Sequence, residues 1–344
     1  MVRLLHPHSP LRIFAVSGLI TIAGLLAALI GLGPAALLTT AILIVIEVIF
    51  SFDNAIVNAK ILGRLSPAWQ TAFLTIGIVI AIFGMRLLFP LVIVALAAHL
   101  GLADVWQLAL NKPHEYADKL QLAHPLIASF GGAFLLLLAL EFFLNGEHKA
   151  LWWQGLERRL KRLHSFWLPT ATAVIIVLIV AGLNHTHGGQ VLRAGLLGVA
   201  VYVAVQLLTW LLGKGQPKGR QLTGWAALSL FVYLQILDAS FSFDGVIGAF
   251  AITDVVVLIA LGLGIGALWV RSMTVFMVRR GTLEQYVYLE HGAYYTILVL
   301  AAALFISLFV DVPDVITGII GLGIIVGALV ASVQAARRKV PAGV

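Results

Sequence analysis

Two short acidic motifs interrupt apolar segments of the sequence and are its first candidates for chemistry. They read Glu47-Val-Ile-Phe-Ser51-Phe-Asp53-Asn54 and, 191 residues later, Asp238-Ala-Ser-Phe-Ser242-Phe-Asp244-Gly245. Each has an acid and then Phe-Ser-Phe-Asp at the same spacing. A carboxylate at the centre of a bilayer costs about 2.5–3.5 kcal/mol on insertion scales. Four such groups are a large penalty for a chain that needs only to fold, so the pattern predicts a cation site that is built twice.

The residue types of the motifs favour a hard divalent cation. On an ideal helix Glu47, Ser51 and Asn54 share one face, and Asp53 lies about 100° from Asn54. One alternative is a continuous helix in which Asp53 faces a different neighbouring helix. The other, which we favour, is that the helix unwinds near Ser51–Asn54 and frees backbone carbonyls as ligands. Oxygen ligands suit Mg²⁺, Ca²⁺ or Mn²⁺ rather than Cu²⁺ or Zn²⁺, and the chain has no Cys. The predicted ligands are Glu47, Asp53, Asn54, Asp238 and Asp244, supported by Ser51 and Ser242.

The composition predicts that these motifs lie in a membrane. Of the 344 residues 61% are hydrophobic and 11% are charged, against about 25% charged in soluble proteins. Apolar runs long enough to span a bilayer recur along the chain, which predicts an all-α, polytopic bundle forming one membrane domain. We expect ten spans, at residues 11–33, 35–58, 71–98, 123–146, 167–183, 190–212, 222–250, 254–278, 291–310 and 314–336.

The basic residues alternate between the two sides of these spans. Seventeen Lys and Arg residues fall on one side and three on the other, which places both termini in the cytoplasm. The seventeen are Arg3, Arg12, Lys60, Arg64, Lys149, Arg158, Arg159, Lys161, Arg162, Lys214, Lys218, Arg220, Arg279, Arg280, Arg337, Arg338 and Lys339. The net charge of +7 is therefore a feature of the loops and does not indicate nucleic-acid binding.

The two motifs also suggest an internal repeat. They lie five spans apart, so their helices run in opposite directions, and each is followed by a Gly and, nine residues later, an Arg: Gly77 and Arg86, then Gly262 and Arg271. We expect an inverted repeat, residues 1–184 and 185–344, with the site near the midplane between the repeats. The two arginines either pair with the motif acids or extend to the membrane surface.

Two connections between spans are long enough to have a structure of their own. Residues 99–122 are expected to form a non-helical extracytoplasmic connection of mixed charge. Residues 147–166 form a basic cytoplasmic connection, which is either a loop that sets topology or an amphipathic helix on anionic headgroups. The sequence favours the loop.

At the two motifs the chain resembles the TerC (tellurium-resistance) family of membrane proteins, within the LysE-like transporter superfamily. The first family motif, roughly Glu-x-x-Leu-Ser-x-Asp-Asn, matches Glu47 to Asn54 with Phe50 in place of Leu. The second, roughly Asp-x-x-Phe-x-x-Asp-Ser and then Phe-Ala-Ile-Thr, matches Asp238 to Thr253 with Gly245 in place of Ser. The resemblance implies a TerC-related bacterial branch that exports manganese or a similar divalent ion from the motif acids.

The expected function is therefore a secondary transporter in the bacterial inner membrane, with a divalent cation, Mn²⁺ first, as substrate and no prosthetic group. The expected partners are the lipid bilayer and the ion, with no nucleic acid, and the sequence leaves the oligomeric state open. We expect no enzyme activity, because no Ser/His/Asp or metal-hydrolase pattern stands out. Two alternatives stay open. One is a membrane scaffold that assists insertion or metalation of other proteins, and the other is a LysE-like exporter of small solutes.

Overall fold

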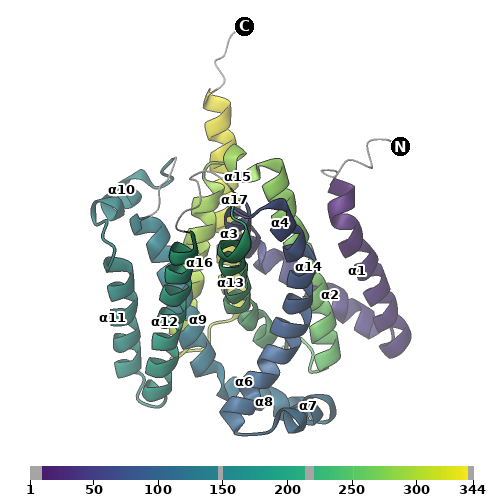
Figure 1. The fold of residues 1–344 in the computed structure, drawn as a ribbon. Helices are drawn as coiled ribbons and strands as arrows, with labels where there is room; N and C mark the ends of the chain where they lie inside the picture. The colour runs from purple at the N-terminus through teal and green to yellow at the C-terminus, as the bar shows by residue number, and fades with distance from the viewer. Residues whose placement is uncertain (1–9, 146–149, 214–220, 251, 340–344) are drawn as a thin grey trace. The chain divides into compact units, whose positions relative to one another are not determined.

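The computed structural model describes residues 10–145, 150–213, 221–250 and 252–339, and within these ranges it contains helices and no strand (Figure 1). The chain is an all-α membrane bundle, as its composition predicts. The first part contains α1 (Pro10–Leu32), α2 (Pro34–Phe50), α3 (Phe52–Leu62), α4 (Pro67–Leu74), α5 (Ile76–Val79), the π-helix η2 (Ile80–Leu88), α6 (Phe89–Ala98), α7 (Leu102–Asn111), α8 (Pro113–Leu122) and α9 (His124–Asn145). The remainder contains α10 (Gln154–Arg162), α11 (Leu168–Leu183), α12 (Gly188–Gly213), α13 (Gly224–Phe250), α14 (Val256–Arg280), α15 (Thr282–Gln285), α16 (Leu289–Ile306) and α17 (Asp314–Lys339).

Every predicted span coincides with helical structure. In the described ranges, eight helical segments are long and apolar enough to cross a bilayer, and the bent pair α2–α3 makes a ninth. The remaining predicted span corresponds to α11, which is apolar but has only 16 residues. A helix needs roughly 17–25 apolar residues to span the hydrocarbon core, so α11 is at the short end.

Contacts divide the chain into two units. The first comprises Met1–His124 and Gln216–Arg280 and contains both motifs. Within it α14 is central, because it packs against α1, α2, α3 and η2. The second unit comprises Pro125–Gly215 and Gly281–Val344; there α11 packs on α12 and α16 packs on α17. Each unit draws helices from both predicted repeats, and the repeat itself stays a prediction.

The first motif lies at a break in a helix. α2 ends at Phe50 and α3 begins at Phe52, with Ser51 between them at φ −100° and ψ 17°, and the two helix axes differ by 54°. The predicted unwinding at this motif is therefore confirmed, but it is limited to Ser51. α13 instead continues as a helix from Gly224 to Phe250, so the second motif is not unwound.

The two long connections are both helical in part. The expectation of a non-helical segment at residues 99–122 is wrong, because α7 and α8 occupy most of it. Pro113 begins α8 at a position where its missing N–H is not needed, and Val105, Tyr116 and Leu120 are buried, which gives these short helices an apolar face. Burial also raises the pKa of Tyr116. In the basic connection, α10 corresponds to the amphipathic-helix alternative rather than to a plain loop.

Candidate functional site

The helix break gives Asp53 its surroundings. Asp53 lies in the first turn of α3, where its carboxylate faces the backbone N–H groups of Asp53 and Asn54. The first N–H groups of a helix have no partner within the helix and carry its positive dipole end, so they suit a carboxylate. Asp53 and Glu47 are each only 4% exposed and close enough for their charges to repel.

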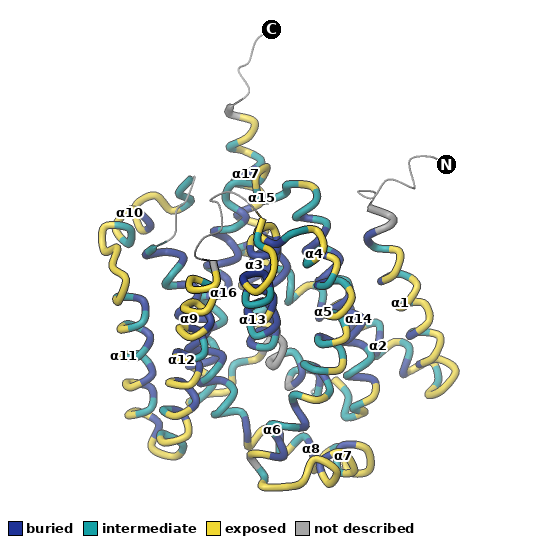
Figure 2. The backbone as a smooth tube through the Cα atoms, viewed as in Figure 1, coloured by how far each residue is buried: buried dark blue, intermediate teal, exposed yellow. Residues whose placement is uncertain are grey.

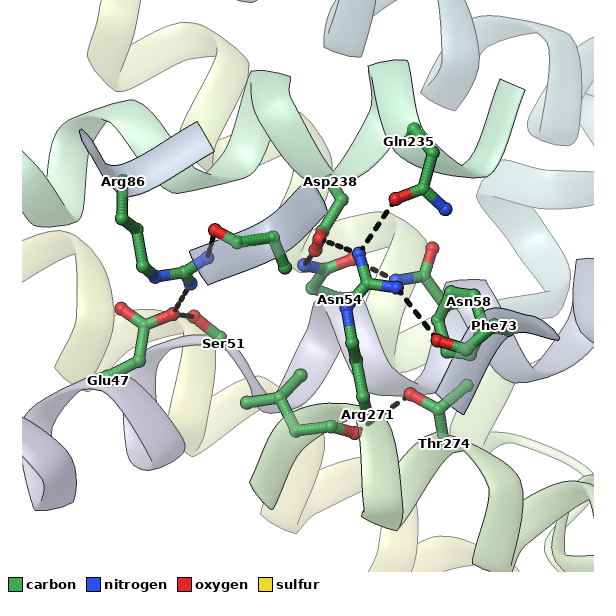
Figure 3. A network of polar contacts seen from close by, with 12 residues as sticks. Glu47, Ser51, Asn54, Asn58, Phe73, Arg86, Gln235, Asp238, Arg271 and Thr274 are labelled. Atoms are coloured by element: carbon green, nitrogen blue, oxygen red, sulfur yellow. Dashed lines mark hydrogen bonds and ion pairs between the residues drawn. The ribbon is translucent and has the colours of Figure 1, made fainter. Parts of the chain in front are cut away.

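The acid of the first motif pairs with the arginine that follows it. Glu47 forms an ion pair with Arg86 and also accepts a 3.1 Å hydrogen bond from the Ser51 hydroxyl (Figure 3). Arg86 lies in the π-helix η2, and its Nη1 donates to the carbonyl of Ala81 at 3.3 Å. Both charged side chains are buried, so Arg86 is paired inside the protein and does not extend away from it.

The acid of the second motif pairs with its own arginine in the same way. Asp238 on α13 forms an ion pair with Arg271, which is only 1% exposed in the middle of α14. The guanidinium also donates to Gln235 Oε1 at 3.0 Å and to the Phe73 carbonyl at 3.3 Å, and it stacks 4.4 Å from the centroid of the Phe73 ring. Four different groups therefore hold Arg271, and Figure 3 shows them converging on it.

The two motifs contact each other at both ends. Asn54 Nδ2 donates to Asp238 Oδ1 at 2.9 Å, so the last residue of the first motif meets the first residue of the second. A Cβ built on Gly245 would lie 3.2 Å from Glu47 Oε2, so the last residue of the second motif meets the first residue of the first. This reciprocal pairing requires that the two segments run antiparallel at the site.

Two glycines on neighbouring helices allow the charged groups to lie this close. A Cβ on Gly77 would lie 2.5 Å from Arg271 Nη1, and a Cβ on Gly266 would lie 2.5 Å from both Cβ and Cγ of Glu47. A side chain at Gly266 would press on the base of the Glu47 side chain, whereas one at Gly77 would require the end of the Arg271 side chain to shift. Gly77, selected in the sequence for its spacing to Arg86, in fact contacts the arginine of the other motif.

Most of the predicted site residues come together in the first unit. The network joins Glu47, Ser51, Asn54 and Asp238 with Arg86 and Arg271, and Asp53 lies next to Glu47. The side chains of Ser242 and Asp244 lie outside the described residues, although the helix that carries them is described.

Several residues join the network without having been singled out in the sequence. Gln235 lies one turn before Asp238 on the same face of α13. This i, i+3 spacing is visible in the sequence and could have indicated that Gln235 belongs to the site. Asn58 donates to Asn54 Oδ1 at 2.8 Å, and its own Oδ1 is buried with no hydrogen-bond donor in the described part of the chain. The Phe73 carbonyl carries no signal in the sequence, because its availability depends on α4 ending at Leu74.

The charges of this network do not cancel. Glu47 and Asp238 each have an arginine, but no ion pair in the described ranges joins Asp53 to a basic side chain. A buried carboxylate without a counter-ion is costly, so it favours binding of a cation or a proton. In the same ranges no three His, Asp or Glu side chains gather at metal-binding spacing. A metal site here therefore has to combine carboxylate with amide, hydroxyl or carbonyl oxygen.

Comparisons with known proteins place the chain in a family. Comparison with curated proteins and with solved structures gives no match. One family, described as "Protein of unknown function (DUF475)", matches residues 52–339. The match begins inside the first motif and covers Arg86, the whole second motif and Arg271. Because the matched range is most of the sequence, the chain belongs to the DUF475 family of proteins of unknown function.

Proposed function

We propose that this protein is a transporter that moves a divalent cation across the membrane, with the motif acids as its ion site. The observation that carries the proposal is Asp53, a buried carboxylate at a helix break, next to Glu47 and without a basic partner among the described residues. Ionisable groups inside spanning helices are costly and typically mark ion or proton pathways. Helix breaks that line such a pathway offer backbone groups as additional ligands.

The balance of charge in the sequence supports a divalent ion. The two motifs contain four acids, and Arg86 and Arg271 supply two positive charges. If all six groups are ionised, the excess of two negative charges equals the charge of one divalent cation. Asp244 is needed for this balance, so it belongs to the proposed ligand set.

The available oxygen atoms support a hard ion. Asn58 Oδ1 is buried and has no donor among the described residues, and the amide of Asn54 and the hydroxyl of Ser51 lie within the same network. Carboxylate, amide and hydroxyl oxygens suit Mg²⁺, Ca²⁺ and Mn²⁺. The resemblance to TerC proteins puts Mn²⁺ first, and it also suggests export across a bacterial inner membrane with both termini cytoplasmic.

The two arginines act, in this proposal, as tethered counter-cations. Because each guanidinium already neutralises one motif acid, an arriving ion binds first at Asp53 and then competes with an arginine for Glu47 or Asp238. A proton on Asp53 competes for the same carboxylate, which would couple ion export to proton entry. Transport that is independent of pH in proteoliposomes would contradict this coupling.

The test is manganese accumulation in cells that lack their own exporters. The wild-type protein should lower cellular manganese, and Asp53→Asn and Asp244→Asn should both abolish that effect while reaching the membrane in normal amounts. Asp118→Asn is the matched control, because Asp118 is an exposed acid on α8, outside the network, and should behave as wild type.

The same experiment separates the alternatives. A membrane scaffold predicts that both motif variants remain functional, and an exporter of small organic solutes predicts that wild type and variants leave manganese unchanged. If wild type leaves manganese unchanged but lowers another divalent ion in a motif-dependent way, the choice of Mn²⁺ is wrong and the acidic ion site stands.

A further inference from the structure

The second unit carries a short basic helix with two distinct exposed stripes. α10 lies in the chain between the apolar helices α9 and α11, and most of it is exposed (Figure 2). One stripe contains three exposed arginines, Arg158, Arg159 and Arg162. The other contains exposed apolar side chains of α10 and the adjoining turns, which are Trp153, Leu156, Leu163, Phe166 and Trp167.

A buried carboxylate fixes the orientation of this helix. Glu157 is the acidic residue of α10, and it is only 1% exposed. Its two oxygens accept hydrogen bonds from the backbone N–H of Trp152 at 3.1 Å, the backbone N–H of Trp153 at 3.2 Å and the Tyr295 hydroxyl at 3.1 Å. His291 Nε2 lies 3.4 Å from the same carboxylate. The start of α10 is thus tied to α16.

This anchor determines where the two stripes point. Successive residues of a helix are rotated by about 100°, so Arg158, Arg162 and Arg159 lie about 100–200° from Glu157. Leu156 and Leu163 lie about 240–260° from it on the same basis. The basic and apolar stripes are therefore adjacent, on the side of α10 that faces away from the protein.

We propose that this outer side of α10 is a docking surface for anionic phospholipid headgroups. Adjacent basic and apolar stripes are what a helix in the plane of a membrane interface presents, with its arginines at the lipid phosphates. Phe166 and Trp167 support a lipid rather than an acidic protein as the partner. They are exposed and lead directly into the apolar helix α11, where aromatic side chains mark the headgroup level.

Because the chain contains no Cys, one fluorescent label can report on this surface without background. The label is attached to Gln154→Cys in the full-length protein, because Gln154 is exposed and lies outside both stripes. The labelled protein is titrated in uncharged detergent with short-chain phosphatidylglycerol or phosphatidylcholine. We expect a saturable response to phosphatidylglycerol that weakens with salt, and none to phosphatidylcholine. Each arginine removed should weaken binding about fivefold, so R159Q/R162Q should weaken it roughly 25-fold.

Two further variants make the result decisive. K60Q/R64Q removes two exposed basic residues from the other unit and should bind like wild type. R159K/R162K keeps the charge and should retain binding. The proposal is overturned if the two lipids give the same response, if K60Q/R64Q loses as much affinity as R159Q/R162Q, or if R159K/R162K does not restore binding. An acidic peptide that displaces phosphatidylglycerol and binds more tightly would identify a protein partner and overturn it as well.

Discussion

The first motif helix breaks beside its acids, whereas the second runs through its own motif without interruption. In the first, the backbone N–H groups at the start of α3 lie at Asp53, while Glu47 pairs with Arg86 and accepts a hydrogen bond from Ser51. In the second, Asp238 depends on side chains, namely Arg271 and Asn54. Both halves therefore contain a buried acid–arginine pair, but in the first half a helix start also lies at the motif, whereas α13 is continuous there. Arg271 has more partners than Arg86 among the described residues, so changes to the arginines should affect the second half more.

The largest effect should come from removing Arg271. Arg271→Met leaves Asp238 buried without its cation, and breaking a buried pair on one side costs about 3–5 kcal/mol. Arg86→Met should cost less, because Arg86 has fewer partners than Arg271 among the described residues. Thermal unfolding of the purified protein in detergent measures both.

A double variant separates lost charge from lost packing. Asp238→Asn combined with Arg271→Met removes the stranded carboxylate and should recover part of the lost stability. If the double variant is as unstable as Arg271→Met alone, the loss comes from packing against Phe73, and the charge argument for this half is wrong.

The next largest effect should come from the link between the motifs. Asn54→Ala removes the 2.9 Å hydrogen bond to Asp238, and a bond to a charged group is worth about 1.5–3 kcal/mol. Asn58→Ala is the matched control, since Asn58 donates to a neutral amide, where the expected loss is about 0.5–1.5 kcal/mol. The difference in unfolding temperature between the two variants checks this order, and equal losses would contradict it.

A smaller effect should come from adding a methyl group next to the acids. Gly266→Ala pushes on Cβ and Cγ of Glu47, which are close to the backbone and cannot move far, so we expect a loss of about 1–3 kcal/mol. Gly77→Ala meets only the end of the long Arg271 side chain, which can shift, so its loss in unfolding free energy should be smaller. A larger loss for Gly77→Ala would show that Arg271 is held more rigidly than Glu47.

The helical bundle was predictable because membranes constrain sequence strongly. Backbone polar groups must be satisfied within each apolar segment, so runs of apolar residues indicate helices and their approximate ends. The segment 99–122 was predicted wrongly because it contains no long apolar run. Its helices α7 and α8 are short, contain polar residues and are stabilised by burying Tyr116 and Leu120. Such stability depends on tertiary contacts that no local pattern reveals.

The acids of the site were visible in the sequence, but their partners were visible only in part. The repeated spacing brought out Arg86 and Arg271 and left open whether they pair with acids, and the structure shows both in ion pairs. Glu157 was hidden among five basic residues of its connection, where an acid is expected to be a solvated neighbour rather than a buried anchor. Its role depends on α16, more than 130 residues away in the chain, with which it forms a 3.1 Å hydrogen bond at Tyr295.

The smallest effect on stability should come from Gly245, the last residue of the second motif, which faces Glu47 in the first motif. A methyl group at Gly245 would lie 3.2 Å from Glu47 Oε2, so Gly245→Ala forces the carboxylate to shift slightly. That strain is offset by the gain of about 0.5–1 kcal/mol from replacing Gly inside a helix, so the net change should be near zero. Gly245→Ser adds a hydroxyl donor in reach of Glu47 and should unfold at a higher temperature than Gly245→Ala. If Ser is no better than Ala, the second motif does not approach Glu47 closely enough to bond with it. The antiparallel pairing would then rest on Asn54 and Asp238 alone.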